Sequence, residues 1–118
     1  MSDDSTGGDP RDSAASDEGA TAATADVLDE LCATIEDRKH ELPEGSYTAS
    51  LFTHEKGENA VLEKLGEEAT ETILAAKDDD DAELLSESAD LVYHLLVLLA
   101  MKDLDADDLR DELESRFG

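Results

Sequence analysis

Two pairs of acidic residues with the same spacing stand on two successive stretches of helical pattern. The first pair is Glu68-x-x-Glu71 and the second is Glu87-x-x-Asp90. Residues three apart lie on the same side of a helix, so each pair places two carboxylates on one face. Both pairs border apolar positions, where an ionised group that loses water needs a cation or a hydrogen-bonding partner. The spacing therefore predicts a site in which four carboxylates share cations.

A helical wheel orders the acids of the first helix by expected burial. With about 100° per residue, Glu68 lies at the edge of the apolar arc and Glu71 about 60° outside it. Lys64 falls between these two positions. Glu67 is rotated by about 100° from Glu68 and is expected to be the more exposed of the adjacent pair.

The second helix repeats this arrangement. Glu87 falls within its apolar face, Asp90 lies about 60° away, and His94 follows one turn beyond Asp90. Two antiparallel helices joined by a short acidic turn bring both pairs together. A histidine at such a position is more typical of a hydrogen-bonded bundle residue than of a ligand.

Four carboxylates that converge without cations raise one another's pKa values. Mg²⁺ and Mn²⁺ prefer oxygen ligands, and Mg²⁺ also recruits substrate phosphates. Such a site suits metal-assisted attack of water on a phosphoanhydride. The alternative is that these acids lie on a solvated surface. This alternative is favoured for Glu63, Glu67 and the run 78–81, whereas metal binding is favoured for the two spaced pairs. Lys64 is as readily a surface charge as a phosphate ligand.

The elements that position these residues are all helical. The apolar spacing predicts a helix from Asp26 that ends at Pro43 and Gly45, with Thr24 or Asp26 as N-cap. A short helical turn or ordered loop is expected over 46–57. Further helices are predicted from Glu58 or Asn59 to Lys77, from 82 to 102 after the acidic cap 78–81, and from 105 or 106 to 116. The fold class is all-α, a bundle of four to five helices.

The helix over 82–102 predicts a partner. Leu84, Leu91, Val92, Leu95, Leu98 and Leu99 form one broad apolar face, and Leu85, Leu96 and Val97 extend it most of the way round. A helix that is apolar on nearly all sides must be buried on nearly all sides. We therefore expect dimerisation to complete the bundle as a homodimer.

Composition narrows the partners and the compartment. The chain of 118 residues carries 33 Asp and Glu against nine Lys and Arg, a net charge of -24. Nucleic acids and anionic membranes require basic patches, so neither is expected to bind. Self-repulsion of this size favours a protein adapted to concentrated salt, where the Debye length falls to roughly 3 Å at 1 M. The alternative is simply a very soluble acidic protein.

The ends and the cysteine predict a cytoplasmic protein. Residues 1–25 are polar and acidic with almost no large apolar side chain, and we expect them to form a disordered acidic tail before a single domain over 26–118. The start of the chain lacks the basic and apolar regions of a signal peptide. The lone Cys32 is expected to be a small core residue in a reducing cytosol.

The motifs resemble a known family. The acidic pairs match those of the MazG-like, all-α nucleoside triphosphate pyrophosphohydrolases, and within that superfamily the chain is most similar to the phosphoribosyl-ATP pyrophosphatase family. The similarity runs from about 26 to 116. Gly57 and four stretches carry it: Ser46-Tyr47-Thr48-Ala49-Ser50-Leu51, Lys64-Leu65-Gly66-Glu67-Glu68-Ala69-Thr70-Glu71, Ala75-Ala76-Lys77, and Glu87-Ser88-Ala89-Asp90-Leu91-Val92-Tyr93-His94-Leu95-Leu96.

The resemblance implies an activity and roles. It implies Mg²⁺-dependent hydrolysis of phosphoribosyl-ATP to phosphoribosyl-AMP and pyrophosphate, the second step of histidine biosynthesis, in a dimeric bundle; Mn²⁺ is an alternative ion. The implied metal ligands are Glu68, Glu71, Glu87 and Asp90. Glu67 and Glu71 are the implied catalytic acids, Glu67 orienting water. The substrate side is implied to consist of Lys64, which meets phosphate, together with Ser46, Tyr47, Thr48 and His94.

The sequence departs from the family pattern at one place, and two other functions are considered as alternatives. The family usually has more Lys around 60–64, where this chain has Ala60 and Glu63, so phosphate contact could also fall to Lys56 or Lys77. A house-cleaning nucleoside triphosphate pyrophosphohydrolase shares the same chemistry and is disfavoured by the Ser46-Tyr47-Thr48 element. A non-catalytic acidic helical dimer would need none of the four carboxylates.

Overall fold

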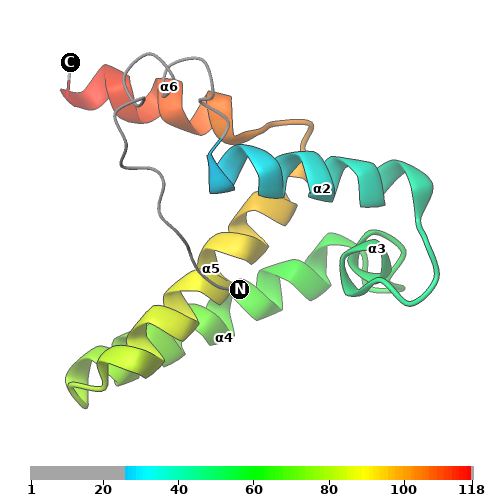
Figure 1. Ribbon diagram of the computed structural model, residues 1–118. Coiled ribbons are helices and arrows are strands. Elements are labelled where there is room, and N and C mark those ends of the chain that lie inside the picture. Colours follow the sequence, from blue (N-terminus) through cyan, green and yellow to red (C-terminus); the bar gives the residue numbers. More distant parts are fainter. Residues whose placement is uncertain (1–25, 118) are drawn as a thin grey trace, which may run out of the picture.

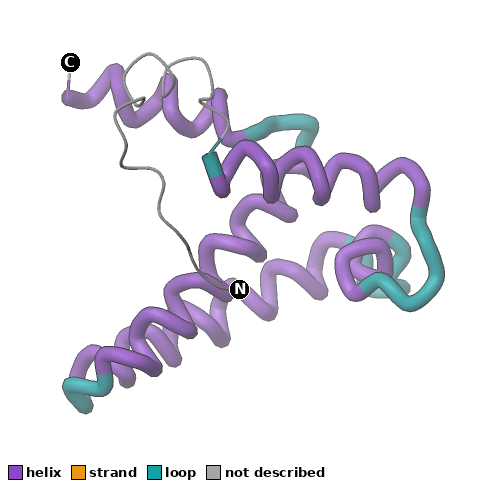
Figure 2. The backbone as a smooth tube through the Cα atoms, viewed as in Figure 1, coloured by secondary structure: helices purple, strands orange, loops and turns teal. Residues whose placement is uncertain are grey.

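The computed structural model describes residues 26–117, which form helices joined by short connections with no strand among them (Figure 1, Figure 2). The predicted all-α class is confirmed. The predicted acidic tail over 1–25 lies outside the described residues, as does residue 118. In the labels of Figure 1, the helices are α2 (Val27–Glu41), α3 (Tyr47–Phe52), α4 (Glu58–Lys77), α5 (Asp81–Met101) and α6 (Ala106–Phe117).

The helix starts follow the capping signals in the sequence. Asp26 is the N-cap of α2, and its carboxylate accepts the backbone N–H groups of Leu28 and Asp29 at 3.0 and 3.1 Å. Asp80 caps α5 by accepting the N–H of Glu83 at 3.0 Å. These side chains satisfy donors that have no partner within the helix. Of the two N-caps considered for the first helix, the structure has Asp26.

The long helices α4 and α5 form an antiparallel hairpin, and theirs is the most extensive contact in the fold. Figure 1 shows α2 crossing one end of this hairpin, with α6 beside α2 and the short α3 near the start of α4. The turn at 78–80 extends away from the other described helices. The acid-bearing middle of the hairpin is therefore covered by few other elements.

The core forms where α2, α3, α4 and α5 meet. Its buried side chains are Ile35, Leu51, Val61, Leu96, Val97 and Ala100. On α5 the single chain thus covers the side that holds Leu96 and Val97, whereas Leu85 and Val92 are exposed. On α4, Ala75 is buried and the adjacent Ala76 is exposed.

An arginine ties the last helix to the first described one. The Arg110 guanidinium on α6 donates to Asp26 at 2.8 Å and to Asp29 at 2.6 Å, both at the start of α2, and to Asp107 at 3.1 Å. The Asp29 bond is the largest of the effects that raise the pKa of Arg110. The acidic cap of α2 therefore also serves as the anchor for α6.

By length and composition alone, α5 is long and apolar enough to cross a membrane, and it is the one such helix among residues 26–117. The core helix of a soluble protein meets the same criteria, and α5 supplies Leu96 and Val97 to the core. That the chain binds no membrane stays a prediction.

The core assignment is tested by truncating Ile35, which is 1% exposed. Ile35→Ala should lower the free energy of unfolding by about 2–5 kcal/mol, because a buried branched side chain is replaced by a cavity. Chemical denaturation in molar KCl, followed by circular dichroism, measures the change. Val27→Ala is the control: Val27 is 72% exposed, and its truncation should change stability by less than about 0.5 kcal/mol. Equal effects of the two variants would contradict the assignment.

Candidate metal and substrate site

The four predicted metal ligands lie on the two helices of the hairpin. Glu68 and Glu71 stand on α4, and Glu87 and Asp90 stand on α5. Glu68 is buried, Glu87 is partly covered, and Glu71 and Asp90 are exposed. This is the order of burial that the helical wheels predict, because the antiparallel packing turns the margins of both apolar faces toward each other.

The charge on Glu87 is destabilised by its neighbours. Its pKa is raised from the ordinary 4.5, first by a hydrogen bond with Glu83 and then by partial desolvation. The negative charges of Glu83, Asp90 and Glu71 add to the shift. Because Glu71 belongs to α4, the acids of the two helices lie close enough to repel one another across the hairpin. That Glu71, Glu87 and Asp90 act together as metal ligands stays a prediction.

The donor set suits a hard divalent cation, although the side chains do not close on one point. All four predicted ligands offer carboxylate oxygens, which Mg²⁺ and Mn²⁺ prefer. Among residues 26–117, no three histidine, cysteine or acidic side chains are placed so that they already form a metal site. The chemistry of the group fits a cation that draws the carboxylates together. Mg²⁺ stays a prediction.

Glu68 differs from the other three because, among residues 26–117, it is the one that pairs with a histidine. His94 Nδ1 lies 2.8 Å from Glu68 Oε1 and 3.1 Å from the backbone oxygen of Asp90. The other ring nitrogen of His94 lies 3.0 Å from the hydroxyl of Tyr47 on α3. His94 is buried. The hydrogen bonds from Tyr47 through His94 to Glu68 therefore link α3, α5 and α4. Contact between His94 and substrate stays a prediction, since both of its nitrogens are engaged here.

The Ser-Tyr-Thr element has three distinct structural roles. Ser46 caps α3, its hydroxyl accepting the N–H of Ala49 at 3.1 Å. Thr48 shares a hydrogen bond with the hydroxyl of Tyr93. Tyr47 and Thr48 on α3 thus contact His94 and Tyr93, which are adjacent on α5. Burial raises the pKa of Tyr93, with the Thr48 bond opposing the shift.

A pocket of about 200 Å³ lies beside this element and contains the second group of predicted residues. Lys64 and Glu67 are both exposed there and form an ion pair at 3.6 Å. Lys56 forms a second pair with Glu63 at 3.0 Å. The residues that line the pocket are Tyr47, Ser50, Leu51, His54, Lys56, Ala60, Glu63, Lys64 and Glu67. Each lysine at this opening is paired with a glutamate that also lines the pocket, and contact of Lys64 with phosphate stays a prediction.

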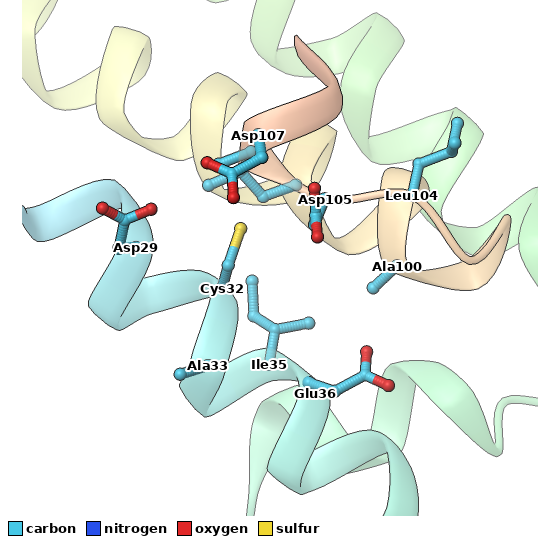
Figure 3. Close-up of a pocket in the computed structure, with 11 residues that line it drawn as sticks. Asp29, Cys32, Ala33, Ile35, Glu36, Ala100, Leu104, Asp105 and Asp107 are labelled. Atoms are coloured by element: carbon cyan, nitrogen blue, oxygen red, sulfur yellow. The ribbon is translucent and has the colours of Figure 1, made fainter. Parts of the chain in front are cut away.

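A larger pocket, of about 260 Å³, contains none of the predicted site residues. Figure 3 shows it between α2 and the connection from α5 to α6, with Cys32 directed toward Asp105 and Asp107. Burial raises the pKa of the Cys32 thiol, and the backbone N–H of Ala106 partly offsets the shift. Cys32 packs against the core, as the sequence predicts.

Three participants are missing from the sequence-based set. Glu83 stands one turn before Glu87, and this i, i+4 spacing was the available signal. Tyr93 belongs to the quoted motif, but its partner Thr48 is 45 residues away. His54 lies in the connection between α3 and α4, two residues before Lys56, and lines the same pocket.

Comparison with known proteins agrees with these motifs. A family model described as phosphoribosyl-ATP pyrophosphohydrolase matches residues 28–117. A phosphoribosyl-ATP pyrophosphatase of Haloarcula marismortui is 77% identical over 93 residues, which are 79% of this chain and 95% of the relative. Relatives of the same name from Natronomonas pharaonis and Haloquadratum walsbyi are 75% and 67% identical, each over 91 residues. Those alignments cover 77% of this chain, and 90% and 91% of the respective relatives.

The effect of Glu83 on the pKa of Glu87 can be measured directly. A carboxyl whose folded pKa is raised contributes stability at low pH that is lost as the pH rises through that raised pKa. Glu83→Gln removes the neighbour with the largest effect, so the pKa of Glu87 should fall toward the ordinary 4.5. Carbon-13 NMR titration of the Glu87 carboxyl measures the shift, with Glu30→Gln on α2 as the control. An unchanged pKa in Glu83→Gln would contradict the arrangement.

Proposed function

Because the chain belongs to the phosphoribosyl-ATP pyrophosphohydrolase family, we propose that it hydrolyses phosphoribosyl-ATP to phosphoribosyl-AMP and pyrophosphate, a step of histidine biosynthesis. The observation that carries the proposal is the acid-rich α4–α5 hairpin within a family match that extends over 28–117. Fold and family together make the chain a hydrolase of a phosphoanhydride.

The proposed reaction breaks the α–β anhydride bond of the substrate with water. The four carboxylates Glu68, Glu71, Glu87 and Asp90 would hold Mg²⁺. The pKa of Glu87 is raised first by its hydrogen bond with Glu83, and the charges of Asp90 and Glu71 add to the shift, so a cation among these acids would relieve that repulsion. When bound, Mg²⁺ neutralises charge on the leaving pyrophosphate and lowers the pKa of a bound water.

The substrate side is proposed to lie at the pocket of Lys56 and Lys64. Glu67 lines the same pocket and pairs with Lys64, which supports a role for Glu67 in orienting water near the phosphates. Tyr47 lines the pocket and also contacts His94, so it joins the substrate side to the partner of Glu68. Ser46 and Thr48 would act by fixing α3, which carries Tyr47.

We propose that a second copy of the chain covers the outer face of the hairpin. Leu85 and Val92 are seven residues apart on α5, and Leu62 and Ile73 are eleven apart on α4, so each pair forms a stripe along its helix. Ile73 is 59% and Leu85 is 72% exposed in the single chain. Large exposed apolar patches mark interaction sites, and these stripes are proposed to form one. A homodimer would bury it and complete the bundle.

The setting of the reaction is proposed to be a salt-rich cytoplasm. The chain carries a net charge of -24, and its relatives at 67–77% identity come from halophilic organisms. In molar salt the mutual repulsion of surface acids is screened within roughly 3 Å. The activity is therefore best measured in molar KCl.

The function is tested by pyrophosphate release from phosphoribosyl-ATP and from a panel of nucleoside triphosphates, in molar KCl with Mg²⁺ or EDTA. The wild-type chain should release pyrophosphate from phosphoribosyl-ATP in the presence of Mg²⁺ and not in the presence of EDTA. Glu71→Gln should lower kcat/KM by at least about 100-fold, since it removes a charged metal ligand.

The control for this assay is Glu114→Gln, an exposed carboxylate on α6, which should keep wild-type activity. Inactivity on every substrate would overturn the enzyme and favour the non-catalytic dimer. Preference for ordinary nucleoside triphosphates would favour the house-cleaning enzyme. Full activity of Glu71→Gln would refute the ligand assignment alone.

The dimer is tested by size-exclusion chromatography with light scattering in molar KCl. The wild type should have about twice the chain mass of 12.7 kDa. The double variant Ile73→Asp/Leu85→Asp should be monomeric, because two charges would enter the apolar interface. Val27→Asp, at an exposed site on α2, should remain dimeric. A monomeric wild type, or a dimeric double variant, would contradict the proposed interface.

A further inference from the structure

We propose that His94 is a positioning residue that fixes the carboxylate of Glu68 for the metal. The inference rests on the proposed function, because it assumes that Glu68 binds a divalent cation. It assigns His94 a role through Glu68 rather than through direct contact with the substrate. Three observations carry it: the partners of Nδ1, the partner of Nε2, and the burial of the pair.

The partners of Nδ1 determine where the ring carries a proton. Nδ1 lies 2.8 Å from Glu68 Oε1 and 3.1 Å from the backbone oxygen of Asp90. An ionised carboxylate and a carbonyl are acceptors only, so Nδ1 must be the donor to both. Nδ1 therefore carries a proton whether the imidazole is neutral or charged.

The partner of Nε2 completes the arrangement. In the neutral ring Nε2 is an acceptor, and the Tyr47 hydroxyl at 3.0 Å donates to it. The rings of Tyr93 and His94 pack edge to face with centroids 4.8 Å apart, which fixes the plane of the imidazole. The orientation of His94 is thus set from α3 as well as from its own helix.

Burial separates this pair from an ordinary surface contact. The side chains of His94 and Glu68 are 6% and 12% exposed. The chain contains a matched pair on α2, His40 and Glu36, with the same 2.8 Å separation but 67% and 53% exposure. An exposed pair competes with water and is weak, whereas the buried bond holds Glu68 Oε1 in one place.

The consequence concerns the second oxygen of Glu68. With Oε1 engaged by His94, the carboxylate cannot rotate freely, and Oε2 remains available as a metal ligand. His94 also bonds to the backbone oxygen of Asp90. Its ring therefore contacts two residues that are predicted to bind the metal, Glu68 on α4 and Asp90 on α5. Partners of this kind typically change metal affinity by about 10–100-fold when removed.

The experiment compares His94→Asn with His94→Gln in Mn²⁺ binding, measured by electron paramagnetic resonance in molar KCl. The amide nitrogen of Asn can take the place of Nδ1, and that of Gln the place of Nε2. His94→Asn should keep the wild-type Kd within about threefold, and His94→Gln should weaken it by at least about tenfold. Equal affinities of the two variants, whether strong or weak, would overturn the positioning role.

Two controls make the result specific. His40→Gln alters the exposed pair and should leave the Kd for Mn²⁺ unchanged; circular dichroism verifies that each variant is folded. Nitrogen-15 NMR of the wild type requires no variant and should show a protonated Nδ1 in His94. An unprotonated Nδ1 would refute the inference. A wild type that binds no Mn²⁺ would instead overturn the metal site of the proposed function, and that failure is visible without any variant.

Discussion

Repulsion between carboxylates on the α4–α5 hairpin is the constraint on which the site depends. Glu83, Asp90 and Glu71 together raise the pKa of Glu87, and no ion pair to Glu71, Glu87 or Asp90 occurs among residues 26–117. The chain has nine Lys and Arg for 33 acids. Several of these cations secure helix ends, as Lys39 does with Asp103 and Arg110 with Asp26. We therefore propose that the charge that relieves the repulsion on the hairpin comes from a divalent ion and from salt.

The carboxylate of Glu68 has a hydrogen-bonding partner within the fold, and this contact connects the other parts of the site. Its carboxylate is buried against His94, and His94 is held by Tyr47. Two of the stretches that carry the family resemblance, those containing Tyr47-Thr48 and Tyr93-His94, therefore contact each other through side chains. Their joint presence in the sequence has a physical reason: α3 anchors the residue that orients a predicted metal ligand, and it also lines the lysine-bearing pocket.

The helices and the burial order of the acids were predictable from the sequence because both depend on local signals. Asp26 and Asp80 act as N-caps because a short carboxylate side chain can accept the backbone N–H groups of the first turn. The helical wheel places Glu68 closer to the core than Glu71, and Glu68 is buried. The wheel of α5 could not say which side the single chain would bury, because Leu96 and Val97 are no more apolar than Leu85 and Val92. The Glu68–His94 bond joins residues 26 apart on different helices, and only the packing of the hairpin reveals it.

The central claim is that the hairpin carboxylates bind a divalent cation. Anomalous diffraction from crystals grown with Mn²⁺ tests it most directly, because the metal itself is located. We expect a peak between α4 and α5, within ligand distance of Glu71, Glu87, Asp90 and the Oε2 of Glu68. A peak at the other acidic pocket, beside Asp29, Asp105 and Asp107, or no peak at all, would contradict it.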